Sequence, residues 1–179
     1  MITKSATSWQ RHPHWQSELA HAIRDPAQLI RRLHLPHSLL PAAQAAARLF
    51  PLRVTESYLQ RIVPGDPADP LLRQVLPLEA ELAEDGGQTD PVGDLQAMPS
   101  PGVLHKYAGR VLLVTSGACA IHCRYCFRRH FPYAEASPLQ QHLGETLAYL
   151  RTHEDVHELI LSGGDPLSLL SAEAVAVIR

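Results

Sequence analysis

The sequence lacks the features of a membrane-embedded, nucleic-acid-binding or secreted protein. No apolar run reaches the length of a membrane-spanning helix, and the N-terminal residues do not form a signal-peptide pattern. The 16 Lys and Arg residues nearly balance the 18 Asp and Glu residues, and the formal net charge of −2 predicts neither a nucleic-acid surface nor a membrane surface. We therefore expect a cytoplasmic protein whose thiols stay reduced.

Cysteine is scarce too, but its distribution is informative. All three cysteines, Cys119, Cys123 and Cys126, lie in the stretch GACAIHCRYCFRRHFPY that starts at Gly117. An odd number of closely spaced thiols is a poor disulfide framework in a reducing compartment. The spacing instead predicts a set of ligands.

The first part of the chain is expected to be helical and to have no chemistry of its own. Residues 1–63 form a helical N-terminal region in which Pro26 and Pro36 separate short helices, with Ser38 and Thr55 as caps. Residues 64–108 are rich in Pro, Gly and Asp, which predicts an irregular connecting segment with a short helix near LLRQVL. We assign the N-terminal region to packing or assembly.

Residues 109–179 carry a different pattern. RVLLVTSG and ELILSGGDP predict two buried strands, and between them Ser137 with Pro138 predicts a helix start followed by a stripe of leucines. Ser171 is expected to cap a second helix. This order indicates parallel strands covered by helices, which is an α/β fold. Because two parallel strands do not make a stable sheet, we expect the chain to be the N-terminal part of a longer protein.

Three thiolates could bind zinc or an iron–sulfur cluster. Structural zinc needs four closed ligands, and His122 or His130 would have to complete the set. A 4Fe-4S cluster held by three cysteines leaves one iron open to a small molecule. Unligated thiols are the simplest alternative, but they leave the close spacing unexplained.

The spacing Cys-x3-Cys-x2-Cys directly after a strand resembles the radical S-adenosylmethionine (SAM) enzymes. The resemblance implies that residues 109–179 form the first βα units of a TIM-like (β/α) barrel. It also implies that Cys119, Cys123 and Cys126 hold the cluster and that SAM binds its open iron. It also implies that the SGGD stretch, Ser162, Gly163, Gly164 and Asp165, binds the amino group of SAM. Tyr125 either packs against the adenine or is an ordinary core tyrosine.

Longer stretches narrow the resemblance. LHKYAGRVLLVTSGACAIHCRYCFRRHFPY and SGGDPL resemble the lysine 2,3-aminomutase family, most closely the bacterial branch that makes (R)-β-lysine for elongation factor P modification. FPLRVTESYLQRI, DPADPLLRQVLP and TDPVGD are similar to that branch as well. The implied reaction is the isomerisation of L-lysine to (R)-β-lysine with a 4Fe-4S cluster, SAM and pyridoxal phosphate. The implied partners are L-lysine and, indirectly, elongation factor P and its lysyl ligase.

The resemblance also assigns residues to roles. Arg128 matches the arginine that holds the substrate carboxylate, and its alternatives are a solvated loop arginine or a counter-charge to the cluster. Arg110 matches a residue that contacts pyridoxal phosphate, and Tyr107 is a candidate for the same cofactor because it lies in the same patch. Lys106 stands where a relative carries arginine. The family's pyridoxal-binding lysine lies beyond this stretch, so we expect residues 1–179 alone to be inactive. A radical SAM enzyme with another substrate and a non-catalytic zinc-binding module remain the alternatives.

Overall fold

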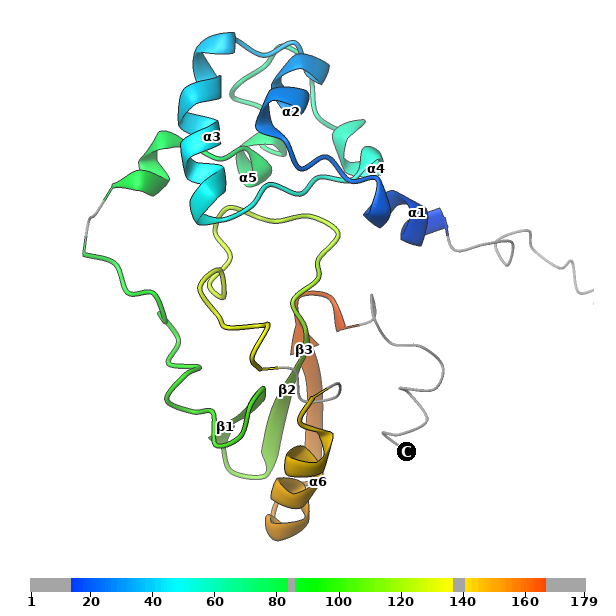
Figure 1. The fold of residues 1–179 in the computed structure, drawn as a ribbon, viewed down its shortest axis with the longest axis vertical. Helices are drawn as coiled ribbons and strands as arrows, with labels where there is room; N and C mark the ends of the chain where they lie inside the picture. The colour runs from blue at the N-terminus through cyan, green and yellow to red at the C-terminus, as the bar shows by residue number, and fades with distance from the viewer. Residues whose placement is uncertain (1–13, 84–85, 137–140, 167–179) are drawn as a thin grey trace, which may run out of the picture. The chain divides into compact units, whose positions relative to one another are not determined.

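The computed structural model describes residues 14–83, 86–136 and 141–166, and it divides into two compact units (Figure 1). Within these residues the first unit runs to Leu82 and includes Ala120–Arg124. The second unit comprises Ala83–Cys119 and the residues from Tyr125 onward. None of the helices among the described residues is long and apolar enough to cross a membrane.

The first unit is built from short helices, as the proline positions predicted. Asp25 accepts a hydrogen bond of 2.9 Å from the Ala27 N–H and so caps a helix whose first residue is Pro26. Thr55 occupies the N-cap position of a later helix, although its side chain forms no capping hydrogen bond. The expected cap at Ser38 is wrong, because Ser38 lies inside a 3-10 turn. The elements are α1 (His14–Ala20), α2 (Pro26–Arg32), η2 (His37–Leu39), α3 (Leu40–Leu49), α4 (Glu56–Leu59), α5 (Leu72–Val75) and η3 (Glu79–Leu82).

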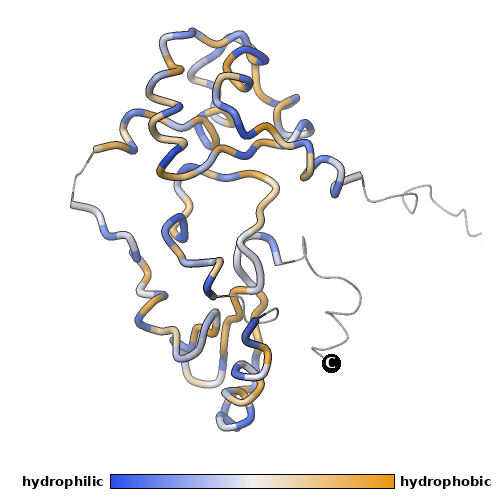
Figure 2. Tube along the Cα trace, in the orientation of Figure 1, coloured by the Kyte–Doolittle hydropathy of each residue, from blue (hydrophilic) through white to orange (hydrophobic). Residues whose placement is uncertain are grey.

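The helices of the first unit enclose one apolar core. Hydrophobic and hydrophilic residues alternate along them, as expected for helices with one buried face (Figure 2). The core also takes in Ile121 from between the first two cysteines, which packs against its surface. Its most deeply buried members are Leu29, Ala43, Leu52, Val54, Leu72 and Val75.

The second unit contains a three-stranded sheet in the order β1-β2-β3. The predicted strands are present as β2 (Arg110–Ser116) and β3 (Glu158–Gly163), and they pair in parallel as expected. The helix α6 (Leu143–Thr152) lies between them in the sequence. The α/β class is thus confirmed, with a small mixed sheet.

One strand differs from the sequence-based expectation. The segment 64–108, expected to be irregular apart from one short helix, holds α5 but also β1 (Val103–Tyr107), which pairs antiparallel with β2. The turn between these strands is closed by Gly109 at φ +78°, a conformation that favours glycine. The expected helix start at Ser137–Pro138 and the helix capped by Ser171 lie outside the described residues.

The two faces of the sheet have different environments. On one face, the strand residues Val103, Val111 and Leu113 pack with Tyr149 and Leu150 of α6. On the other face, Leu104 pairs in register with Leu112, and Leu112 pairs with Ile160. Because side chains alternate along a strand, the helix covers the first face only, and the second face forms the floor of a cavity.

Candidate functional site

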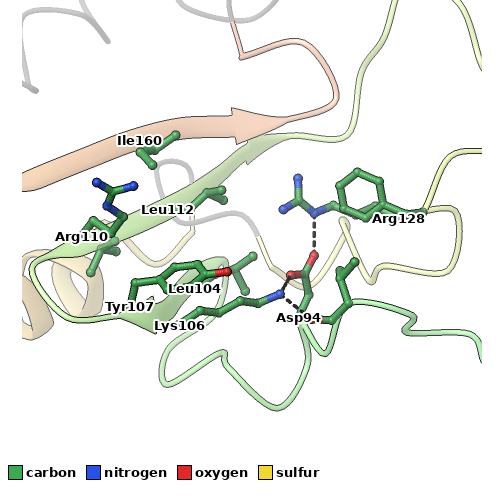
Figure 3. Close-up of a pocket in the computed structure, with 11 residues that line it drawn as sticks. Asp94, Leu104, Lys106, Tyr107, Arg110, Leu112, Arg128 and Ile160 are labelled. Atoms are coloured by element: carbon green, nitrogen blue, oxygen red, sulfur yellow. Dashed lines mark hydrogen bonds and ion pairs between the residues drawn. The ribbon is translucent and has the colours of Figure 1, made fainter.

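A cavity of about 260 Å³ lies over the second face of the sheet (Figure 3). Its floor is the apolar row of Leu104, Leu112 and Ile160, one residue from each strand. The polar residues that line it are Asp94, Lys106, Tyr107, Arg110 and Arg128. Three of these, Tyr107, Arg110 and Arg128, are residues to which the sequence analysis assigned a cofactor or substrate role.

Arg128 is the most constrained of the predicted site residues. It is only 9% exposed, so the alternative of a solvated loop arginine is wrong. Its Nε donates a hydrogen bond of 2.7 Å to Asp94 Oδ2, and its Nη1 donates one of 3.1 Å to the Ser162 hydroxyl. The guanidinium also lies 4.8 Å from the centre of the Phe127 ring. These contacts hold the guanidinium in one orientation at the cavity wall.

Asp94 is the residue that the sequence analysis missed. Its carboxylate is 2% exposed and joins two cations, because Oδ1 accepts from Lys106 Nζ at 2.5 Å while Oδ2 accepts from Arg128. Burial raises the pKa of Asp94, but the hydrogen bonds from Lys106 and Arg128 outweigh it and leave that pKa below its usual value. One buried carboxylate between two cations leaves the group with a net positive charge.

Arg110 and Tyr107 lie at the more exposed rim of the same cavity. The Arg110 guanidinium pairs with Glu158 at 2.9 Å, and its side chain is 52% exposed. Tyr107 is 68% exposed. An apolar floor with a cationic, partly aromatic wall fits a planar ring that bears a phosphate, so these residues suit pyridoxal phosphate.

The SGGD stretch lies against the backbone that leads to the first cysteine. Gly164 N–H donates to Ser116 O and Asp165 N–H donates to Ala118 O, each at 2.6 Å. A Cβ on Gly164 would clash with the carbonyl of Ala118 and would lie 2.8 Å from the Cys119 sulfur. Glycine is therefore required at position 164 for this close approach of the two segments.

Tyr133, a half-buried residue of the second unit, is influenced electrostatically by two of the cysteines. Burial raises the pKa of Tyr133 to about 12, and the negative charges of the Cys126 and Cys119 thiolates contribute to the rise. Cys126 also lines a second cavity of about 440 Å³ together with Arg129 and His130.

Cys123 belongs to the first unit by its contacts. All three cysteines are half-buried. Among the residues that the structure describes, no three His, Cys, Asp or Glu side chains are arranged to hold a metal ion. The three-cysteine ligand set therefore stays a prediction from the spacing.

Two further predictions concern side chains near the cysteines. Tyr125 is 69% exposed, so the alternative of an ordinary core tyrosine is wrong, and its contact with adenine stays a prediction. His122 places its Nδ1 2.9 Å from the Pro51 carbonyl oxygen and stacks on the Phe50 ring. That hydrogen bond occupies one of the two ring nitrogens that the zinc alternative would draw on.

Comparison with known proteins bears on the choice between zinc and iron. Residues 107–179 match a family model described as a 4Fe-4S single cluster domain, which favours the iron–sulfur interpretation.

Relatives with curated names cover most of this chain. The L-lysine 2,3-aminomutase of Escherichia coli (strain K12) is 44% identical over 155 residues, which are 86% of this chain and 45% of that protein. The L-lysine 2,3-aminomutase of Haemophilus influenzae is 40% identical over 166 residues, 92% of this chain and 49% of that protein. The enzyme of the same name from Clostridium subterminale is 30% identical over 92% of this chain and 40% of that protein. The chain spans less than half the length of these relatives, and over most of its own length it is a sequence relative of the L-lysine 2,3-aminomutases.

Proposed function

We propose that these residues are part of a radical SAM L-lysine 2,3-aminomutase, an isomerase that converts L-lysine to (R)-β-lysine. The observation that carries the proposal is the buried Arg128, which Asp94 and Ser162 orient at the wall of a cavity two residues after Cys126. A fixed guanidinium is suited to hold a carboxylate through two parallel hydrogen bonds. The relatives named L-lysine 2,3-aminomutase support lysine as the amino acid.

The cysteines and the SGGD stretch are proposed to hold the radical-generating group. Cys119, Cys123 and Cys126 would ligate a 4Fe-4S cluster, which when bound supplies the electron that cleaves SAM. Gly163 and Gly164 would offer backbone polar groups to the amino group of SAM. Asp165 is exposed beside them and adds a carboxylate for the same ammonium. Tyr125 would cover the adenine.

The cationic cavity is proposed to bind pyridoxal phosphate together with the amino acid. The carbonyl of the cofactor supplies the imine chemistry on the substrate's amino group. Arg110 and Lys106 would hold the phosphate, Tyr107 would lie against the ring, and Arg128 would hold the substrate carboxylate. Leu104, Leu112 and Ile160 would exclude water below the ring.

The finer assignments are proposals as well. The resemblance to the elongation factor P branch supports a role for the product in modifying that factor through its lysyl ligase. The parallel pairing of β2 with β3 supports the start of a (β/α) barrel in the whole protein. Because the family's pyridoxal-binding lysine lies outside residues 1–179, we propose that these residues alone do not turn over lysine.

The test is lysine turnover by the full-length protein after anaerobic loading with iron, sulfide, SAM and pyridoxal phosphate. Chiral chromatography with mass detection measures (R)-β-lysine. Arg128→Gln is expected to lower kcat/KM for lysine about 10- to 100-fold, the loss of a charged hydrogen bond of about 1.5–3 kcal/mol. Arg151→Gln, on the exposed end of α6, serves as the matched control and should leave kcat/KM unchanged.

Three outcomes would count against the proposal. Arg128→Gln with wild-type kcat/KM would remove the arginine from substrate binding. A product other than β-lysine would favour a radical SAM enzyme with another substrate. Stoichiometric zinc with no electron paramagnetic resonance signal from a reduced cluster would favour the zinc-binding alternative.

A further inference from the structure

The segment between the first and the third cysteine is attached to the helical first unit. Ala120–Arg124 belongs to that unit, and two of its backbone N–H groups are hydrogen-bonded there. His122 N–H donates to Arg53 O at 2.9 Å, and Arg124 N–H donates to Gln74 O at 2.8 Å. These two residues flank Cys123, so the backbone on both sides of that cysteine is fixed to the helical unit.

The Arg124 side chain strengthens this attachment. Its guanidinium forms a two-bond ion pair with Glu81, with Nε to Oε1 at 2.9 Å and Nη2 to Oε2 at 2.7 Å. Nη1 donates to the carbonyl of Phe50 at 2.8 Å, and the Phe50 ring lies 5.2 Å from the guanidinium carbon. Glu81 is itself fixed, since its Oε1 also accepts from the N–H of Leu78 at 3.0 Å.

The burial of this pair sets it apart from another Arg–Glu pair in the same unit. The side chains of Arg124 and Glu81 are 5% and 12% exposed. Arg32 also donates two hydrogen bonds to Glu56, from Nη1 at 2.7 Å and from Nη2 at 2.9 Å, but these two side chains are 41% and 44% exposed. A buried ion pair often stabilises a fold no better than apolar residues of the same volume would, because both charges lose their water. A requirement for orientation explains better why an ion pair lies here.

We propose that Glu81 and Arg124 are positioning residues for Cys123, whose backbone they fix within the first unit so that its thiol is held ready to ligate iron. The inference rests on the proposed function, in which Cys123 is a cluster ligand. It gives the N-terminal helices a role beyond packing. The expected magnitude follows from other metal sites, where loss of a residue that orients a ligand costs about 10- to 100-fold in metal affinity.

The decisive variant replaces both charges at once. Glu81→Leu combined with Arg124→Met keeps the volume and leaves no unpaired buried charge, so the first unit should stay folded. We expect the cluster affinity of this variant to fall at least 10-fold below that of the full-length wild-type protein. The affinity is measured as the iron and sulfide bound per chain when iron is limiting. Hydrogen exchange of peptides from α3 and α5 in the apo protein should show protection equal to or above that of the wild type. Glu56→Leu combined with Arg32→Met is the matched control, and it should change neither quantity.

The possible results distinguish a failure of the proposed function from a failure of the positioning role of Glu81 and Arg124. No cluster in the wild-type protein would overturn the proposed function. A wild-type cluster together with an unchanged affinity in the Glu81→Leu, Arg124→Met variant would overturn the inference alone. If that variant loses exchange protection, Arg124→Lys with Glu81 intact replaces it, because lysine keeps the charge but not the forked geometry. The cluster affinity of Arg124→Lys should fall several-fold, and the electron paramagnetic resonance spectrum of its reduced cluster should change less when SAM is added. Wild-type values for both quantities would also overturn the inference.

Discussion

Asp94 offers a quantitative test of the cavity, because its carboxylate forms ion pairs with both Lys106 and Arg128. Asp94→Asn keeps the shape of the side chain but turns one oxygen into an N–H donor that faces a cation. Breaking a buried ion pair costs about 3–5 kcal/mol, and we expect about 3 kcal/mol because the Lys106 side chain, 26% exposed, can regain water. The loss should be local to the second unit, which contains all three residues.

Hydrogen exchange with mass detection measures this loss at the site. Peptides that cover β1 and β2 should exchange about 100-fold faster in Asp94→Asn at neutral pH, provided they open by unfolding of the sheet. Glu158→Gln is the matched control, since it removes the carboxylate of the exposed pair with Arg110 and should cost less than about 1 kcal/mol. Equal exchange rates in Asp94→Asn and the wild type would refute the role of Asp94.

The pH dependence supplies an independent check on the same residue. The pKa of Asp94 is lower in the folded protein than its usual value. Its contribution to stability is therefore complete above the unfolded pKa of about 3.9 and is lost as the pH falls through the lower folded pKa. The difference between wild type and Asp94→Asn should shrink in that acidic range and stay constant from pH 5 to pH 8.

Three other residues give sharp expectations. Gly164→Ala should lower the free energy of unfolding by about 1–3 kcal/mol and reduce the iron content after loading, because the new Cβ would meet the Ala118 carbonyl and the Cys119 sulfur. Gly144→Ala in α6 is the control and should change neither quantity, because the space around Gly144 is open. Equal iron contents in the two variants would contradict the close approach at Gly164. Tyr149→Phe removes the hydroxyl that lies 2.6 Å from His105 Nδ1 and should cost about 1 kcal/mol by hydrogen exchange of β1 peptides, and unchanged exchange would contradict it. Asp69→Asn should lower the local free energy of unfolding by about 1–3 kcal/mol, measured by hydrogen exchange of α5 peptides, because Asp69 accepts hydrogen bonds from the N–H groups of Leu71, Leu72 and Val63. The bond from Leu72 does most to lower the pKa of Asp69, so the effect of the substitution should fade as the pH falls below about 4. An effect that persists at lower pH would contradict this role.

The elements that the sequence predicted are those with strong local signals. Proline positions separated the short helices of the first unit, and the β-branched run after Gly109 predicted β2. The strand β1 was missed because its sequence, VLHKY, buries only its first two residues fully and alternates weakly. The expected cap at Ser38 was wrong because a 3-10 turn takes up that position before α3 begins.

The contacts that the sequence did not predict are long-range. Asp94 and Arg128 are 34 positions apart, and the Asp94 segment is rich in Pro, Gly and Asp, a composition that predicts turns rather than a buried carboxylate. Glu81 and Arg124 are 43 positions apart. A charged residue in a basic loop gives no local sign of its partner, so only tertiary structure shows which arginines are solvated and which are buried. The cysteine spacing, by contrast, is a local pattern.

The positions of the cysteine motif and the SGGD stretch explain how the residues proposed to bind lysine and those proposed to bind SAM lie close together. Arg128 follows Cys126 by two residues, and Ser162 directly precedes the two glycines. The hydrogen bond from Arg128 to Ser162 therefore joins the residue proposed for the substrate carboxylate to the loop proposed for SAM. A hydrogen transfer between two bound molecules requires their reacting carbons to be held in van der Waals contact, so a displacement of either loop would cost rate even with both molecules bound. Asp94 holds the Nε of the same guanidinium, and the two contacts together restrict Arg128 more than the cysteine loop alone could.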